Sequence, residues 1–248
     1  MITGLASAFA FGTVLPASRR GGSLGPATVT WLPAVGAVLG AVAAATLWAG
    51  GWAFGENSPL TGLLAVTVLL LLTRGLHLDG LADTADGLGC HGSPERARAV
   101  MREGSVGAFG VAAVVVAVGL QAAAFTGMSA GLTGLIAAVT SVTAGRVAAV
   151  VACRRGIEVG AGSTLASRVA GTQSPAVLAV WVAGVCGLAT FATPRPWQGP
   201  VVVALALAAA AALVGHCVRR FDGVNGDVIG AAIELTTTLT AIGLVIRP

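Results

Sequence analysis

The sequence RGLHLDGLADTADGLG, residues 74–89, follows an unbroken apolar run and carries three aspartates at a helical spacing. Asp79, Asp83 and Asp86 stand at positions i, i+4 and i+7. On a helix these side chains fall within roughly 60° of one another and share one face. Like charges at this spacing repel and weaken the helix. The pattern therefore predicts a bound divalent cation, and carboxylate oxygens favour Mg²⁺ or Mn²⁺, with substrate phosphates completing the shell.

The ordinary alternative for these aspartates is that they cap a helix or are solvated in a loop. Glycines stand beside them at Gly80, Gly87 and Gly89. Glycine lets a ligand approach the backbone closely. Three carboxylates on one face among glycines, at the edge of an apolar segment, favour a ligand site over a solvated loop.

The composition indicates an integral membrane protein. Of the 248 residues, 56% are apolar and 10% are charged, and the mean hydropathy is +0.90. Soluble domains carry about 25% charged residues. We therefore expect an all-α, polytopic helix bundle in a lipid bilayer, forming a single catalytic domain over residues 1–248. The net charge of +4 gives no indication of a nucleic-acid partner.

Apolar segments long enough to cross a bilayer recur along the chain. A spanning helix needs about 20 residues, and seven segments qualify. They lie near residues 31–50, 58–75, 106–127, 131–152, 176–193, 199–218 and 228–246. The apolar run before Pro16 is too short to span, so we expect an interfacial or re-entrant N-terminal helix there.

The arginines are distributed unequally between the two sides of the expected bundle. Eleven of the 14 lie on the side of the acidic stretch and two on the other, while Arg146 falls within a span. Because cytoplasmic loops are enriched in basic residues, we expect a multi-pass protein of the cytoplasmic membrane. Its N-terminus and acidic stretch would face the cytoplasm. The eleven are Arg19, Arg20, Arg74, Arg96, Arg98, Arg102, Arg154, Arg155, Arg168, Arg219 and Arg220; the two are Arg195 and Arg247.

A short basic segment follows the acidic stretch. Ser93-Pro94-Glu95 predicts the start of a short helix, which would carry Arg96 and Arg98 and end near Arg102. Arginine forks suit phosphate oxygens, and Arg102 is our candidate for a diphosphate. The alternative is that these arginines only anchor a cytoplasmic loop. Gly107, in the glycine series that follows, would form a phosphate-facing turn.

Ionisable residues inside the spans are further candidates. A charge at Arg146 requires a partner, which either Glu234 or the acidic stretch would supply. Asp227 precedes Glu234 by about two turns on one helix face. Favourable placement at a helix N-terminus is an alternative explanation for Asp227. His77 is equally compatible with packing at a helix end and with proton transfer.

The segment HLDGLADTADG, from His77 to Gly87, resembles the signature of the cobalamin-5′-phosphate synthase (adenosylcobinamide-GDP ribazoletransferase) family. MREGSVGAFG and GVNGDVIGAAIEL resemble two further motifs of that family, and the similarity covers nearly the whole chain. The sequence departs from the family's pattern at Glu103, at Gly104-Ser105 and at Asn225. The pair Asp83 and Asp86 with Gly87 is also similar to the opening of the CDP-alcohol phosphatidyltransferase motif, but the second aspartate pair of that motif is missing.

The resemblance implies a phosphotransfer reaction on two nucleotide-containing substrates. A ribose hydroxyl of α-ribazole, or of its 5′-phosphate, would attack the cobinamide-side phosphorus of adenosylcobinamide-GDP and release GMP. Asp79, Asp83 and Asp86 would hold Mg²⁺. Arg102 and Arg146 would bind the diphosphate, with Gly107, Asn225 and Glu234 as further substrate-binding candidates.

The sequence leaves the proton acceptor and the broader function class open. Asp227 or His77 would take the proton from the attacking hydroxyl, with Asp83 completing the catalytic set, and a homo-oligomer is an open expectation. Two alternatives are a CDP-alcohol phosphotransferase and a cation-coupled transporter with intramembrane carboxylates.

Overall fold

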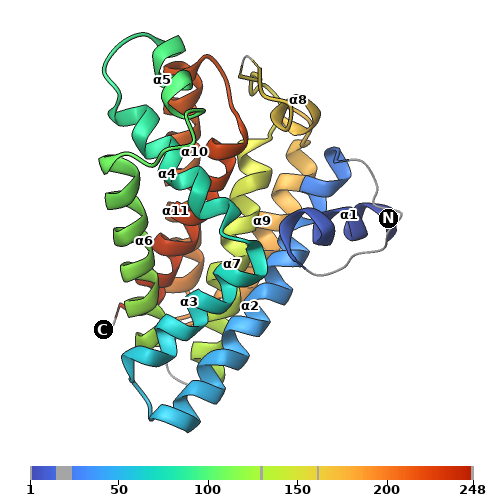
Figure 1. Ribbon diagram of the computed structural model, residues 1–248. Coiled ribbons are helices and arrows are strands. Elements are labelled where there is room, and N and C mark those ends of the chain that lie inside the picture. Colours follow the sequence, from blue (N-terminus) through green and yellow to red (C-terminus); the bar gives the residue numbers. More distant parts are fainter. Residues whose placement is uncertain (1, 15–23, 129–130, 161, 247–248) are drawn as a thin grey trace.

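The computed structural model describes residues 2–14, 24–128, 131–160 and 162–246, and these form an all-helical bundle (Figure 1). No strand occurs in these ranges; they contain two isolated β-bridges. The helices are α1 (Ile2–Gly12), α2 (Pro26–Phe54), α3 (Pro59–Thr73), α4 (Leu76–Gly89), α5 (Pro94–Val100), α6 (Ala108–Gly127), α7 (Leu132–Ala152), α8 (Ala166–Val169), α9 (Pro175–Ala189), α10 (Gln198–Phe221) and α11 (Gly226–Leu244).

All seven expected spans correspond to helices, although they differ in length. Within the described residues α2, α6, α7, α10 and α11 are long and apolar enough to cross a membrane, and the pair α3–α4 counts as a sixth if it is one broken span. α9 has 15 residues and is shorter than a typical span. The protein is therefore a polytopic helical bundle with five or six spans by length and composition.

α7 occupies the centre of the bundle and packs against α2, α9, α10 and α11 (Figure 1). Small residues bring the backbones together: a methyl group on Gly40 of α2 would lie 2.7 Å from the Val139 Cα of α7. A methyl group on Gly145 would likewise collide with Thr237 of α11. Such small-residue contacts are typical of helix packing in membranes.

A sharp break between α3 and α4 sets the direction of the acidic helix. Arg74 and Gly75 adopt left-handed backbone conformations, with φ of 57° and 64°. The two helices consequently meet at 92°. α4 thereby turns across the bundle and packs against α11 and α6.

Two smaller features concern the ends of helices. α5 begins at Pro94, and the Ser93 hydroxyl accepts a hydrogen bond from the Arg96 amide, which confirms the predicted helix start. The N-terminal apolar run forms α1, which packs on α2; its interfacial position remains a prediction. Arg19, Arg20 and Arg247, which contributed to the predicted topology, lie outside the described residues.

Candidate active site

One face of α4 packs closely on the start of α11. A methyl group on Gly80 would lie 2.8 Å from the Asp227 carbonyl oxygen, and one on Gly230 would lie 3.1 Å from the carbonyl oxygen of His77. Glycine at these two positions lets the two backbones approach each other. The contact fixes Asp227 beside the acidic face of α4.

The neighbouring face of α4 packs on the N-terminus of α6 through Asp86. The Asp86 Oδ2 accepts a hydrogen bond from the Gly107 N–H at 2.7 Å, and its Oδ1 accepts one from the Gly110 N–H at 2.8 Å. The side chain is buried, with 8% of the residue surface exposed. A carboxylate at a helix N-terminus satisfies free amides and complements the helix dipole. Asp86 is therefore engaged in holding α6 to α4.

The other two aspartates of the stretch are less buried, since Asp79 is exposed and Asp83 is half-buried. The Asp83 carboxylate is subject to charge repulsion from Asp227, Asp79 and Asp86. Asp227 in turn is repelled by Asp79. Asp79, Asp83 and Asp227 thus form a cluster of negative charge contributed by two helices.

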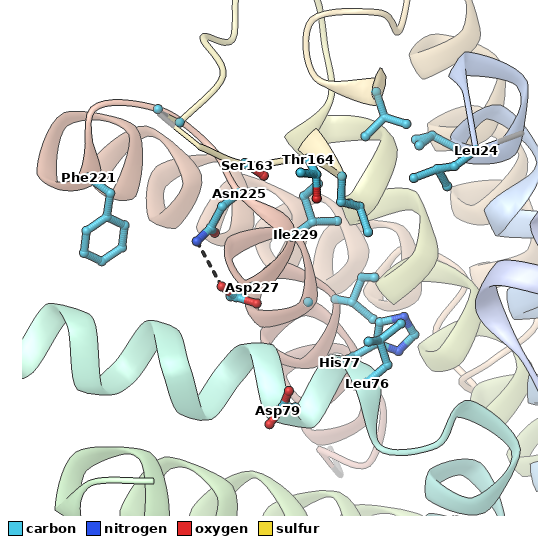
Figure 2. A pocket seen from close by; sticks show the side chains of 18 of the residues that line it. Leu24, Leu76, His77, Asp79, Ser163, Thr164, Phe221, Asn225, Asp227 and Ile229 are labelled. Atoms are coloured by element: carbon cyan, nitrogen blue, oxygen red, sulfur yellow. Dashed lines mark hydrogen bonds between the residues drawn. The ribbon is translucent and has the colours of Figure 1, made fainter. Parts of the chain in front are cut away.

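Asn225 holds Asp227 in place at the start of α11. Its Oδ1 accepts a hydrogen bond from the Val228 amide at 2.9 Å, which caps the helix. Its Nδ2 donates to the Asp227 Oδ2 at 3.0 Å, as Figure 2 shows. One amide side chain therefore both starts α11 and orients the carboxylate.

A cavity of about 300 Å³ lies beside this acidic cluster. It is bounded by α4, α11, the start of α2 and the loop around residues 160–165 (Figure 2). Its polar lining includes His77, Asp79, Ser163, Thr164, Asn225 and Asp227. Most of the remaining lining is apolar and includes side chains of α1, α2 and α11, so the cavity has both polar and apolar walls.

Two arginines lie at the rim and have different surroundings. Arg98 Nη1 donates to the Phe221 carbonyl oxygen at 2.8 Å and to Asp222 Oδ2 at 2.6 Å. The hydrogen bond described for the Arg102 guanidinium involves only its Nε, which donates to the Arg98 carbonyl oxygen at 3.0 Å. Arg98 therefore fastens α5 to the end of α10, and the exposed Arg102 belongs to the lining of the cavity.

His77 lies in the cavity wall with its ring buried. Neither ring nitrogen has a hydrogen-bond partner among the described residues. A buried polar group without a partner is costly unless a ligand or water satisfies it. The ring is thus suited to hydrogen-bond a molecule that enters the cavity.

Arg146 and Glu234 lie apart from the cavity lining, deep between α7, α11 and α6. Glu234 Oε2 accepts a hydrogen bond from Gln121 Nε2 at 2.7 Å, and Gln121 also donates to Thr238. Glu234 supplies the opposite charge that acts on Arg146. Among the described residues no ion pair or hydrogen bond joins Arg146 to Glu234, so the partnership expected from the sequence stays a prediction.

Carboxylates and arginines around a cavity are features of many phosphotransfer enzymes, so the site alone does not identify the family. A family model described as cobalamin-5-phosphate synthase matches residues 4–245. The chain belongs to the cobalamin-5-phosphate synthase family. No solved structure matches it.

Related members of the cobalamin-5-phosphate synthase family bear the name adenosylcobinamide-GDP ribazoletransferase. The protein from a Nocardioides species is 40% identical over 84% of this chain and 82% of its own length. The protein from Chlorobaculum parvum is 33% identical over 95% of this chain and 92% of its own length. The protein from Frankia casuarinae is 34% identical over 74% of this chain and 70% of its own length.

Within this family member, the structure gathers only part of the predicted site. Five predicted residues line the cavity: His77, Asp79, Arg102, Asn225 and Asp227. Asp83 joins them through the acidic cluster. Gly107 and Asp86 bind each other at the α4–α6 contact, and Arg146 and Glu234 lie beneath the site. In the described part of the chain, no three His, Cys, Asp or Glu side chains are arranged to hold a metal ion by themselves.

The sequence reasoning missed the contribution of the loop between α7 and α8. Ser163 and Thr164 line the cavity, and Val159 forms a β-bridge with Val224 that holds this loop to the start of α11. Single hydroxyl residues in a loop of mixed composition carry no spacing signal. Only the fold brings them opposite Asp227.

Proposed function

We propose that this chain is an adenosylcobinamide-GDP ribazoletransferase. The ribose hydroxyl of α-ribazole, or of its 5′-phosphate, attacks the cobinamide-side phosphorus, forming a new O–P bond. The diphosphate bridge breaks at the same phosphorus, GMP leaves, and the hydroxyl proton passes to an acceptor on the protein. The observation that carries the proposal is that Asp79 and Asp227, which both act electrostatically on Asp83, line a cavity that also bears Arg102.

The acidic cluster suits Mg²⁺, with Mn²⁺ as a substitute. Carboxylate oxygens are the ligands that Mg²⁺ prefers, and it is bound through one or two carboxylates together with waters and substrate phosphates. Because the carboxylates of the cluster repel one another, a bound cation would relieve this repulsion. Asp79 and Asp83 would hold it together with substrate phosphates, whereas both oxygens of Asp86 accept hydrogen bonds from the start of α6. When bound, the ion neutralises the charge that develops on the diphosphate.

The protein's own side chains bind and orient the two substrates. Arg102 offers its terminal nitrogens to phosphate oxygens in a forked arrangement. Asp227 Oδ2 is held by Asn225, so its Oδ1 is available to accept the hydroxyl proton. The His77 ring, whose nitrogens have no hydrogen-bond partner among the described residues, hydrogen-bonds the acceptor nucleoside. This division assigns binding, proton transfer and orientation to different residues.

We also propose that the protein lies in the cytoplasmic membrane with this site facing the cytoplasm. In Figure 1, α5, α8 and the end of α10 are at one end of the bundle, the end that contains the basic loops. The positive-inside rule assigns such an end to the cytoplasm. A water-soluble nucleotide donor and product would then have direct access.

GMP release by the detergent-purified protein tests the function. With adenosylcobinamide-GDP, α-ribazole and Mg²⁺, we expect release that requires all three and that stops when a chelator is added. Asp79→Asn and Asp83→Asn should lower the rate by at least ~10²-fold, the scale of losing one electrostatic stabiliser of a transition state, while the protein still elutes as a folded species. Release unchanged in both variants contradicts the metal assignment. Release of CMP from a CDP-alcohol, or transport without product in sealed vesicles, contradicts the proposed reaction.

A further inference from the structure

The turn that joins α10 to α11, residues 222–225, contacts other parts of the cavity wall. Its backbone holds the loop between α7 and α8. The Val224 N–H donates to the Glu158 carbonyl oxygen at 2.9 Å, and the Gly160 N–H donates to the Val224 carbonyl oxygen at 2.8 Å. The last residue of the turn is Asn225, which caps α11. The turn therefore fixes two parts of the site, the loop and the start of α11.

The first residue of the turn, Asp222, holds a third part, the helix α5. Its Oδ2 accepts a hydrogen bond from Arg98 Nη1 at 2.6 Å, and the same nitrogen donates to the Phe221 carbonyl oxygen at 2.8 Å. A helix of seven residues needs tertiary contacts to persist. Of the seven residues of α5, all of them described, only Ala97 is buried. The Arg98–Asp222 ion pair is therefore one of the contacts that fix where α5 lies beside α10.

Arg102 follows α5 and is held at the cavity by it. The Arg102 Nε donates to the Arg98 carbonyl oxygen at 3.0 Å. The tip of the side chain lies beside the loop between α7 and α8, because a methyl group on Gly162 would be 3.4 Å from Arg102 Nη1. Arg98, Arg102 and Gly162 all line the cavity. A continuous series of contacts thus leads from Asp222 through Arg98 to the guanidinium of Arg102.

Resting on the proposed function, in which Arg102 binds the diphosphate, we infer that Asp222 is a positioning residue for the donor. Its carboxylate fixes Arg98, and Arg98 fixes Arg102. Asp222 itself is not among the described residues that line the cavity. Its side chain is 56% exposed, and exposed ion pairs contribute little to stability. Loss of the carboxylate therefore leaves a folded protein in which Arg102 is no longer held in place.

Three substitutions isolate this role. Asp222→Gly removes the carboxylate without backbone strain, because glycine readily adopts the left-handed φ of 54° found there. Asp222→Asn is the conservative variant, since asparagine tolerates this conformation and keeps an oxygen that accepts from Arg98. Glu95→Ala is the matched control. The Glu95 Oε1 lies 3.3 Å from Arg98 Nη2, but Glu95 belongs to α5 and does not join that helix to α10.

Equilibrium dialysis of adenosylcobinamide-GDP with Mg²⁺, without α-ribazole, measures donor binding directly. We expect Asp222→Gly to weaken binding by about tenfold, Asp222→Asn by less than about threefold and Glu95→Ala not at all. Arg102→Ala should weaken binding as well. Adding Asp222→Gly to Arg102→Ala should weaken it by no more than about twofold further, because residues that act through one contact are not additive.

Steady-state kinetics separate a positioning role from a structural one. Asp222→Gly should raise the KM for adenosylcobinamide-GDP and leave the KM for α-ribazole within about twofold, because backbone hydrogen bonds of Val224 hold the loop with Ser163 and Thr164.

Several results would overturn the inference. They are wild-type donor binding by Asp222→Gly, losses that multiply in the double variant, an equal rise in both KM values, and an Asp222→Gly protein that elutes as an aggregate in size-exclusion chromatography. Wild-type protein that binds the donor but releases no GMP overturns the proposed reaction instead, and the binding comparison still decides the role of Asp222.

Discussion

At the residue scale, aspartates on one helical stripe have separate tasks. Asp86 is buried and accepts two backbone hydrogen bonds, whereas Asp79 is exposed and lines the cavity. A sequence pattern shows only that the three share a face. The different roles of Asp86 and Asp79 depend on where α6 begins. The Gly107 and Gly110 amides at this start, about 20 residues further along the chain, bind Asp86.

Replacing Asp86 should lower the stability of the fold and should not act directly on the reaction. Asp86→Ala leaves two helix-start amides without partners, so we expect a loss of about 1–3 kcal/mol of unfolding free energy. Thermal unfolding in detergent, followed by circular dichroism, measures it. Asp79→Asn is the matched control and should unfold like wild type while losing activity. Equal destabilisation by both variants would contradict the division of tasks.

The glycine at position 80 is required for the approach of two backbones. Gly80→Ala introduces a methyl group at 2.8 Å from the Asp227 carbonyl oxygen. We expect overpacking to cost about 1–3 kcal/mol and to displace Asp227, lowering kcat. Gly119→Ala on α6 meets no atom within 4 Å and should be neutral or slightly stabilising. A Gly80→Ala protein with wild-type rate and melting temperature would argue against this contact.

At the element scale, α4 illustrates which parts of the site were predictable. The i, i+4, i+7 spacing correctly predicted a helix with an acidic face, and Asp227 with Asn225 was recognisable at the start of α11. The close approach of α4 to α11 could not be predicted from the sequence. It depends on Gly80 of α4 lying against the Asp227 backbone and on Gly230 of α11 lying against the His77 backbone. Sequence periodicity gives the face of a helix but not the element that packs on it.

Arg146 on α7 and Glu234 on α11 are buried side chains of opposite charge. Glu234→Gln keeps the shape and the hydrogen bond with Gln121 but removes the charge that balances Arg146. An uncompensated buried cation costs about 3–5 kcal/mol, so we expect a poorly folded protein. The double variant Arg146→Gln, Glu234→Gln should recover most of the folded yield in size-exclusion chromatography. A double variant less stable than Glu234→Gln would contradict the pairing.

At the scale of the whole molecule, hydropathy located the seven long apolar helices but not the break between α3 and α4. The expected segment 58–75 corresponds to α3, which ends at Thr73, and the chain turns by 92° into α4. Arg74-Gly75 supplies the left-handed conformations for the turn. A hydropathy window averages over such a break, because it measures transfer into lipid and not backbone direction.

The proposed orientation predicts which positions are reached from outside the cell. Trp52 near the end of α2 is 88% exposed, and Glu95 on α5 lies at the opposite end of the bundle (Figure 1). In a cysteine-free background, a membrane-impermeant maleimide should label Trp52→Cys in intact cells and Glu95→Cys only after lysis. The opposite labelling pattern would invert the topology and move the site to the outer face.

The short helix α3 has a consequence for the lipid around the protein. Its 15 residues extend only ~22 Å at 1.5 Å per residue, less than the ~30 Å hydrocarbon thickness of a typical bilayer. A helix shorter than the bilayer is accommodated by local thinning of the bilayer or by flanking side chains that reach to the interface. The thinned part of the bilayer would lie beside the break between α3 and α4, next to Arg74. A substrate too polar for the lipid interior would then meet water almost at the level of the acidic helix.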